Sequence, residues 1–199
     1  MTRVFAAVER SLAPPWGPLI DLVSRVRFRA TLDWALGGPG PATHAFVVVA
    51  DSERDTPGCC WRLDAARPRA TFTRYQHPGF PPGLPETALW ELDGDVVAAE
   101  AAARDAAGTA YSMTELLNQA MFPLSDLGIP VHYASVREAC ICTTLTCRVM
   151  AAVGGRTSQV AAETMVGDAY PEELAQRLLA GQRCGWFRRV SPATLAALP

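Results

Sequence analysis

Apolar and polar residues alternate along this chain with two different periods, which predict a mixture of helices and strands. Between residues 4 and 28 apolar residues recur three and four positions apart, beginning with Val4 and Val8. That spacing is typical of an amphipathic helix, and Pro14-Pro15 divides the stretch into two. We therefore expect residues 1–35 to form an N-terminal helical extension, followed by a single domain over residues 36–199.

Strands are predicted where apolar residues are continuous or alternate with polar ones. The run from Ala45 to Ala50 is uninterrupted and rich in valine, so residues 44–50 are expected to form a buried strand. Residues 60–65 and 70–75 alternate and are separated by a short connection, which predicts a pair of adjacent antiparallel strands. Shorter strands are expected at 90–92 and, to close the sheet, at 186–190.

Later segments carry helix start and stop signals. Asp95 is placed to cap a helix, Ser112 begins a capping-box spacing, and Pro171 stands where proline is favoured at a helix start. Helices are therefore expected over 95–107, 113–121, 142–153 and 171–179. Residues 122–136 are expected to form a loop with one short strand. The predicted fold class is α+β, with a small antiparallel sheet packed against helices.

Composition and charge narrow the classes of protein. The chain has 199 residues, of which 49% are hydrophobic and 19% charged, which indicates a compact globular protein. Its net charge of −2 gives no electrostatic reason to expect a nucleic-acid partner. Glu9 and Arg10 interrupt the N-terminal apolar run, so no secretory signal is expected. No stretch reaches the roughly eighteen uninterrupted apolar residues of a transmembrane helix, so none is expected either. All lysine and arginine positions are arginine, which indicates the codon bias of a GC-rich bacterial or phage genome. The expected location of the protein is the bacterial cytoplasm or the phage virion.

Six cysteines raise the questions of disulfides and of metal. They stand at positions 59, 60, 140, 142, 147 and 184. Without a secretory signal, reduced thiols are the expectation. Cys140, Cys142, Cys147 and Cys184 could hold zinc or an iron–sulfur cluster, but the C-x-C-x4-C spacing fits neither a zinc ribbon nor a ferredoxin. We expect no metal and no cofactor.

Cys142 is the candidate nucleophile. If it is the first residue of the helix over 142–153, then Leu145 and Val149 face the core, and main-chain N–H groups of the first turn surround the sulfur. This position favours the thiolate, the reactive form of the side chain. Cys140 precedes the helix and Cys147 lies within it. The alternative is that these cysteines are small buried hydrophobic residues, as most unpaired cysteines are.

Histidine and an acid complete the chemistry that a thiol nucleophile needs. His44 begins the predicted strand 44–50 and is the candidate base, with His132 as its rival and His77 in a predicted turn. A base of this kind needs an acceptor on its second nitrogen. Asp64, on the strand 60–65, is the candidate, although a solvated carboxylate is an equally open interpretation. His44 could likewise be a polar strand cap.

These residues lie in short motifs with a definite order. Thr43-His44 precedes the hydrophobic run, Leu63-Asp64-Ala65 follows, and Gly108-x-x-Tyr111 leads into a helix. Ile141-Cys142-Thr143 and Pro171-x-x-Leu174 complete the order. In these motifs, from about residue 40 to 180, the chain resembles the circularly permuted NlpC-type papain-like enzymes. That group includes the YiiX-like and YaeF-like hydrolases and is related to lecithin:retinol acyltransferase-like proteins.

The resemblance implies a papain-like fold and a catalytic triad of Cys142, His44 and Asp64. It implies a thiol peptidase or amidase that cleaves amide bonds, first of all in peptidoglycan peptides. Two positions depart from the family pattern: Thr143-Thr144 stand where serine and an acidic residue are usual, and Asp64 stands where glutamate is frequent. Alternative functions are a structural virion or tail component that contacts other phage tail proteins, and a lipid acyl hydrolase or acyltransferase whose residues 4–28 lie on a membrane surface.

Overall fold

The computed structural model describes residues 2–11, 16–28, 34–37, 40–51, 59–65, 68–76, 87–114, 116, 117, 121, 128, 139–166 and 169–191. Within them, a six-stranded sheet runs in the order β4-β3-β2-β1-β5-β8, and every neighbouring pair is antiparallel. Its strands are β1 (Thr2–Glu9), β2 (His44–Asp51), β3 (Cys59–Ala65), β4 (Ala70–Gln76), β5 (Thr87–Glu91) and β8 (Arg188–Val190). A separate parallel pair joins β6 (Ala110–Tyr111) to β7 (Ala139–Cys140).

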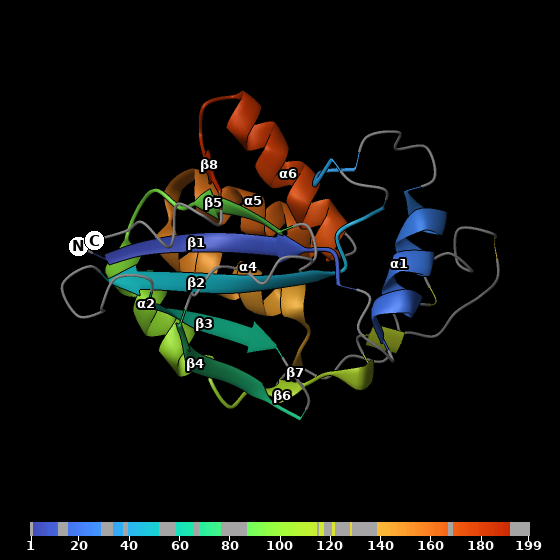
Figure 1. The fold of residues 1–199 in the computed structure, drawn as a ribbon, viewed down its shortest axis with the longest axis horizontal. Coiled ribbons are helices and arrows are strands. Elements are labelled where there is room, and N and C mark those ends of the chain that lie inside the picture. Colours follow the sequence, from blue (N-terminus) through green and yellow to red (C-terminus); the bar gives the residue numbers. More distant parts are fainter. Residues whose placement is uncertain are drawn as a thin grey trace.

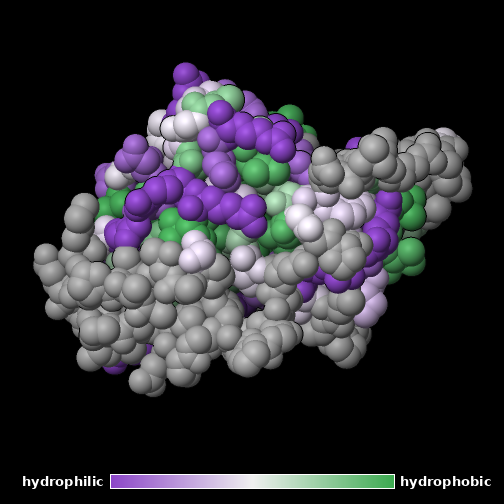
Figure 2. All heavy atoms as spheres, turned by 45° about the horizontal axis from the view of Figure 1, so that its top comes forward, coloured by the Kyte–Doolittle hydropathy of each residue, from purple (hydrophilic) through white to green (hydrophobic). Residues whose placement is uncertain are grey.

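The described helices lie mainly on one face of this sheet. They are α1 (Trp16–Arg27), α2 (Val96–Asp105), α4 (Cys142–Val153), α5 (Gly155–Val166) and α6 (Pro171–Arg183). Helices α2, α4 and α5 lie behind the sheet, α6 crosses its upper edge, and α1 stands at one end (Figure 1). Seen from the α6 side, the coloured surface mixes hydrophilic and hydrophobic residues (Figure 2). The predicted α+β architecture with an antiparallel sheet packed on helices is confirmed.

The main core lies between the sheet and α4. Leu145, Val149 and Met150 of α4 are at most 1% exposed and pack on the strand residues that point to the helical face. From β1 these are Val4, Ala6 and Val8, and from β2 they are Ala45, Val47 and Val49. A second buried cluster lies on the opposite face of the same strands and includes Phe5 and Phe46. Strands β1 and β2 are therefore buried on both faces.

Burial on both faces explains the main error of the sequence prediction. Residues 2–9 form strand β1, in the middle of the sheet between β2 and β5, and not a helix. A strand that alternates apolar and polar residues is easily recognised, but one buried on both sides has a continuous apolar run that also matches a helical spacing. The second half of the predicted helical stretch is correct, since Trp16–Arg27 is α1.

Most other predicted elements are confirmed. The strands β2 to β5 and β8 and the helices α2, α4 and α6 all occur where the pattern placed them. Helix α5 was not predicted, because Gly154-Gly155 was taken only as the end of α4; Gly154 has a φ of 83° and the chain re-enters a helix at once. Of the expected helix over 113–121, the described residues 113, 114, 116, 117 and 121 are helical, whereas the expected loop over 122–136 lies outside the described residues apart from Gly128. Among the described helices, none is long and apolar enough to cross a membrane.

We predict that Ala6→Asp strongly destabilises the protein. Ala6 is fully buried, pairs with Val47 and Trp90 on the two neighbouring strands, and faces the helices. An unpaired carboxylate there should lower the free energy of unfolding by about 3 kcal/mol or more. Val97→Asp, at a position that is 73% exposed, is the control. Equal melting temperatures for the two variants, measured by circular dichroism, would contradict the central placement of β1.

Candidate active site

Cys142 is the first residue of helix α4, as the sequence predicted. Ile141 before it is extended, with φ −107° and ψ 173°, and its carbonyl accepts the first intrahelical bond from the N–H of Leu145 at 2.9 Å. Thr144 fixes this start further, because its hydroxyl oxygen accepts the N–H of Ile141 at 2.9 Å. The Cys142 sulfur thus lies at the positive end of a helix dipole, where a thiolate is stabilised.

His44 is the first residue of β2 and lies opposite Glu9 of β1. The preceding residue, Thr43, is tied to the end of β1: its hydroxyl accepts the N–H of Ser11 at 2.7 Å and donates to the carbonyl of Ser11, also at 2.7 Å. The His44 side chain is 21% exposed, and Cys142 is 4% exposed. The backbone at the start of β2 is therefore held in place by Thr43, while the His44 side chain remains partly exposed to solvent.

A buried carboxylate on α6 holds the segment that leads into His44. Glu172 is fully buried, and its two oxygens accept the backbone N–H groups of Ala35 at 3.0 Å and Ala42 at 2.7 Å. Burial raises the pKa of Glu172, and the two N–H groups oppose that rise. The sequence placed Glu172 in the first turn of this helix, but nothing in the local pattern indicated that it binds a segment so distant in the chain.

His44 and Asp64 form a hydrogen-bonded pair, with Nε2 of the ring 2.7 Å from Oδ1 of the carboxylate. Strand β3 pairs with β2 so that Val47 lies opposite Leu63 and Val48 opposite Arg62. The same register sets Asp64 diagonally next to His44 on one face of the sheet, within reach of a side-chain contact. This is the neighbouring-strand arrangement that the sequence predicted.

Asp64 occupies only one ring nitrogen of His44, and the Cys142 thiol lies close enough to His44 for each group to shift the pKa of the other. Burial alone would lower the pKa of His44, but the charge of Cys142 and the bonds to Asp64 and Cys142 raise it well above 6.5. Burial would raise the pKa of Cys142, whereas the charge and hydrogen bond of His44 lower it below its usual 9.0. Both directions favour a thiolate paired with an imidazolium.

Two further groups lower the pKa of Cys142: the backbone of Ala45 and the hydroxyl of Thr143, whose oxygen lies 3.9 Å from the sulfur. The backbone N–H of Cys142 itself belongs to the first helical turn, where no intrahelical acceptor exists. It is placed to stabilise the oxyanion that forms when the sulfur attacks a carbonyl carbon.

The other candidate residues are separated from this chemistry or fall outside the described part of the chain. Cys147 is buried in α4, and burial raises its pKa to about 12, so its thiolate is disfavoured. Cys60 is buried in β3, and Cys184 is exposed at the end of α6. His77, His132 and the side chains of Cys59 and Cys140 lie outside the described residues. Among the described side chains, no cluster of His, Cys, Asp and Glu could hold a metal.

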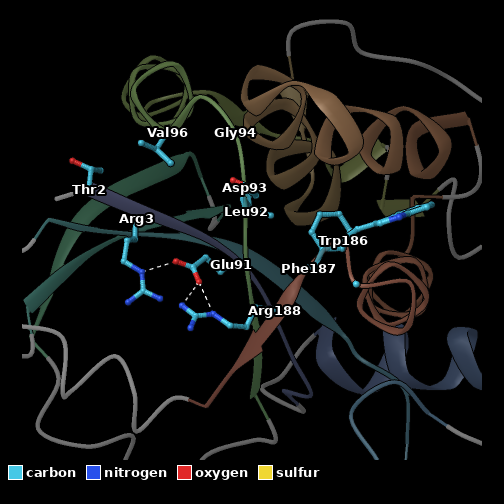
Figure 3. A pocket seen from close by; sticks show the side chains of 11 residues that line it. Thr2, Arg3, Glu91, Leu92, Asp93, Gly94, Val96, Trp186, Phe187 and Arg188 are labelled. Carbon is cyan, nitrogen blue, oxygen red and sulfur yellow. Dashed lines mark hydrogen bonds and ion pairs between the residues drawn. The ribbon is translucent and has the colours of Figure 1, made fainter.

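A cavity of about 520 Å³ lies at the opposite end of the sheet. Figure 3 shows Glu91 between two arginines there: Arg3 donates to one of its oxygens at 2.6 Å and Arg188 to the other at 2.9 Å. Arg3 pairs with Ala50 at the far end of β2, whereas His44 begins that strand. No thiol or imidazole is among the residues that line this cavity, so it does not contain the candidate nucleophile or the candidate base.

Comparisons of this chain with protein-family models, with curated proteins and with solved structures found no match. The case for the site therefore rests on its geometry and on the sequence motifs.

We predict that Cys142 is the fastest-reacting thiol of the protein at mildly acidic pH. Its pKa is lowered, whereas an ordinary thiol is almost fully protonated at about pH 6. Iodoacetamide labelling followed by peptide mapping measures this, with His44→Ala as the variant that should slow labelling. Preferential modification of Cys140 or Cys147 would place the nucleophile elsewhere, and uniformly slow labelling would mean that no thiol is activated.

Asp64→Asn is expected to lower turnover by a large factor while leaving the fold intact. The amide can present its NH₂ group to Nε2 and so favour the wrong ring tautomer, an effect of about 10⁴ in the serine-protease case. Steady-state kinetics and a melting curve of the same preparation separate the two effects. Near wild-type turnover by a folded Asp64→Asn variant would remove Asp64 from the site.

Proposed function

We propose that the protein is a thiol hydrolase that cleaves amide bonds through Cys142, His44 and Asp64, by way of an acyl-enzyme. The observation that carries this proposal is the chain of contacts from the Cys142 sulfur through the His44 ring to the Asp64 carboxylate. Each member comes from a different element, and a nucleophile, a base and an orienting group are what acyl transfer requires.

In the proposed reaction the Cys142 thiolate attacks the carbonyl carbon of the substrate amide. The negative charge that develops on the carbonyl oxygen is stabilised by the N–H of Cys142 at the start of α4. The His44 imidazolium gives its proton to the departing nitrogen, so that the C–N bond breaks and a thioester on Cys142 remains. His44, now neutral, removes a proton from water as it attacks the thioester; the C–S bond breaks, the carboxylic acid is released, and the Cys142 thiolate and the His44 imidazolium are restored.

Asp64 has an orienting role in this mechanism. In this role its carboxylate accepts a hydrogen bond from Nε2 of His44 at 2.7 Å, which leaves the other ring nitrogen to serve the Cys142 sulfur. Burial by itself would raise the pKa of Asp64, but its bonds to His44 and Arg62 lower it to about 2. The carboxylate therefore stays ionised over the whole pH range in which the enzyme would work.

The resemblance to permuted NlpC-type enzymes supplies the proposed fold family and substrate. The order His44, Asp64, Cys142 along the chain, an antiparallel sheet that carries the first two and a helix that starts at the third all support it. Peptide amide bonds in peptidoglycan are the substrate that this resemblance implies, and carriage on a phage particle is the proposed setting. The substrate and the setting are thus assigned by analogy with the enzymes that share these motifs and this arrangement of elements.

The alternatives have less support. A structural virion component does not need a thiol whose pKa is lowered inside a buried site, and burying two charged groups costs free energy that a purely structural fold avoids. For a lipid acyl hydrolase, the expected support was an amphipathic stretch over 4–28 that could bind a membrane surface. Residues 4–8 are instead fully buried in strand β1.

We expect the protein to release peptides from purified peptidoglycan or from muropeptides, detected by liquid chromatography and mass spectrometry. Cys142→Ala and His44→Ala should abolish release, because they remove the nucleophile and the base. His132→Ala is the matched control and should retain activity. Release that persists in Cys142→Ala, or that depends on His132 and not on His44, would overturn the assignment.

A further inference from the structure

We propose that Arg62 is a positioning residue of this site, which fixes the Asp64 carboxylate and, through it, the His44 ring. The inference deepens the proposed function and rests on it. Arg62 lies on β3, two residues before Asp64, so both side chains project from the same face of the sheet. No sequence motif distinguishes Arg62, which has the pattern of an ordinary polar residue in an alternating strand.

The two oxygens of Asp64 have different partners. Oδ1 faces Nε2 of His44 at 2.7 Å. Oδ2 accepts a hydrogen bond from Nε of Arg62 at 3.0 Å, and the terminal nitrogen Nη2 lies 2.9 Å from the same oxygen in an ion pair. Rotation of the carboxylate about its side-chain bond would break both contacts. Arg62 therefore keeps the other oxygen directed at the imidazole.

Arg62 is in turn held on two sides. Its guanidinium lies 3.7 Å above the centre of the Phe46 ring, and its Nη2 donates to Glu9 of β1 at 3.3 Å. The His44 ring also stacks against Phe46, with a centroid distance of 6.0 Å and an interplanar angle of 23°. Phe46 is therefore a shared platform that fixes the guanidinium and the imidazole relative to each other.

The strand register makes this cluster possible. Glu9 lies opposite His44, and Phe46 lies two positions further along β2, on the same face. On the outer side, β4 places Thr71 opposite Asp64 and Thr73 opposite Arg62, and neither carries a charge. Among the described residues, the charged and titratable groups that face Asp64 are thus His44 and Arg62, with Cys142 beyond the first and Glu9 beyond the second.

The charges explain why arginine suits this position. Arg62 carries one positive charge between the carboxylates of Asp64 and Glu9, with side-chain exposures of 24% and 12%. A guanidinium can stack flat on an aromatic ring and still donate from its edge to both carboxylates, which a lysine ammonium cannot do. Aspartate is shorter than the glutamate usual in the resembling family, and the Arg62 contacts hold this shorter side chain in place.

The test measures the pKa of the Cys142 thiol from the pH dependence of its alkylation by iodoacetamide. The wild-type protein is compared with Arg62→Gln, Arg62→Lys and Arg104→Gln. Arg104 is the matched control, because it also stacks on aromatic rings, at 5.6 Å from Trp61 and 5.3 Å from Phe72, and pairs with Glu100, but it lies on α2 on the helical side of the sheet. This readout needs no substrate.

Arg62→Gln should raise the thiol pKa by about one unit, equivalent to a tenfold lower thiolate fraction at acidic pH. Loss of the guanidinium frees Asp64 to turn away from His44, and an imidazolium without its carboxylate partner disfavours the ion pair. Arg62→Lys should give a smaller shift, and Arg104→Gln none. If peptide hydrolysis is also measured, the loss should appear in kcat with KM unchanged.

A double-mutant comparison separates positioning from general destabilisation. If Arg62 acts through Asp64, Arg62→Gln should have no further effect on the thiol pKa in an Asp64→Asn background. A folded Arg62→Gln protein with the wild-type thiol pKa, or an additive effect in that background, overturns the inference. An ordinary thiol pKa in the wild-type protein would instead overturn the proposed function, so that the two failures are distinguishable.

Discussion

The pairing of Cys142 with His44 depends on where one helix begins relative to one strand. Cys142 opens α4 and His44 opens β2, so a shift of either start by one residue would turn its side chain away from the other. Each start is fixed by bonds that lie outside the pair. At the start of α4, the Thr144 hydroxyl accepts a hydrogen bond from the N–H of Ile141. Just before β2, the Thr43 hydroxyl accepts one from the N–H of Ser11, which follows β1.

Glu172 adds a third constraint, because it joins α6 to Ala35 and Ala42 just before His44. The fold as a whole therefore holds the two reacting side chains together: α4 packs on the helical face of β1 and β2, and α6 holds the segment that leads into β2. Catalytic pairs tolerate little displacement, since rates fall steeply when reacting groups move by about 1 Å. The close packing of α4 on a strand buried on both faces gives the site the rigidity that this requires.

Burial opposes the ion pair and the surrounding hydrogen bonds offset it. For both His44 and Cys142, burial is the largest single influence on the pKa and acts against the charged form. Each charge is nevertheless favoured, because the other lies beside it and because donors or acceptors surround both. Asp64 pairs with His44 and Arg62 pairs with Asp64 on the face of the sheet, so each of these charged groups has a partner of opposite charge. Removal of any one member leaves its neighbour buried without its partner, which is the costly case.

Local patterns in the sequence were sufficient for those features that depend on neighbouring residues. The helix start at Cys142, the strand start at His44 and the alternating strand that carries Asp64 each show in a few consecutive residues, and the motif order linked them. The features that the sequence did not predict depend on tertiary context. Strand β1 was mistaken for a helix because burial on both faces removes the alternation. Glu172 and Arg62 resemble ordinary surface residues until the chain places Ala42 beside one and Asp64 beside the other.

The central claim is that His44 is an imidazolium paired with the Cys142 thiolate at neutral pH. The nitrogen chemical shifts of the His44 ring, followed by NMR as the pH is raised, measure this directly. The account predicts that both ring nitrogens of His44 stay protonated at pH values well above the usual histidine pKa of about 6.5. In Cys142→Ala the titration should move to lower pH, because the partner charge is lost. A neutral ring at pH 7 in the wild-type protein, with the same titration in Cys142→Ala, would contradict the ion pair and the mechanism built on it.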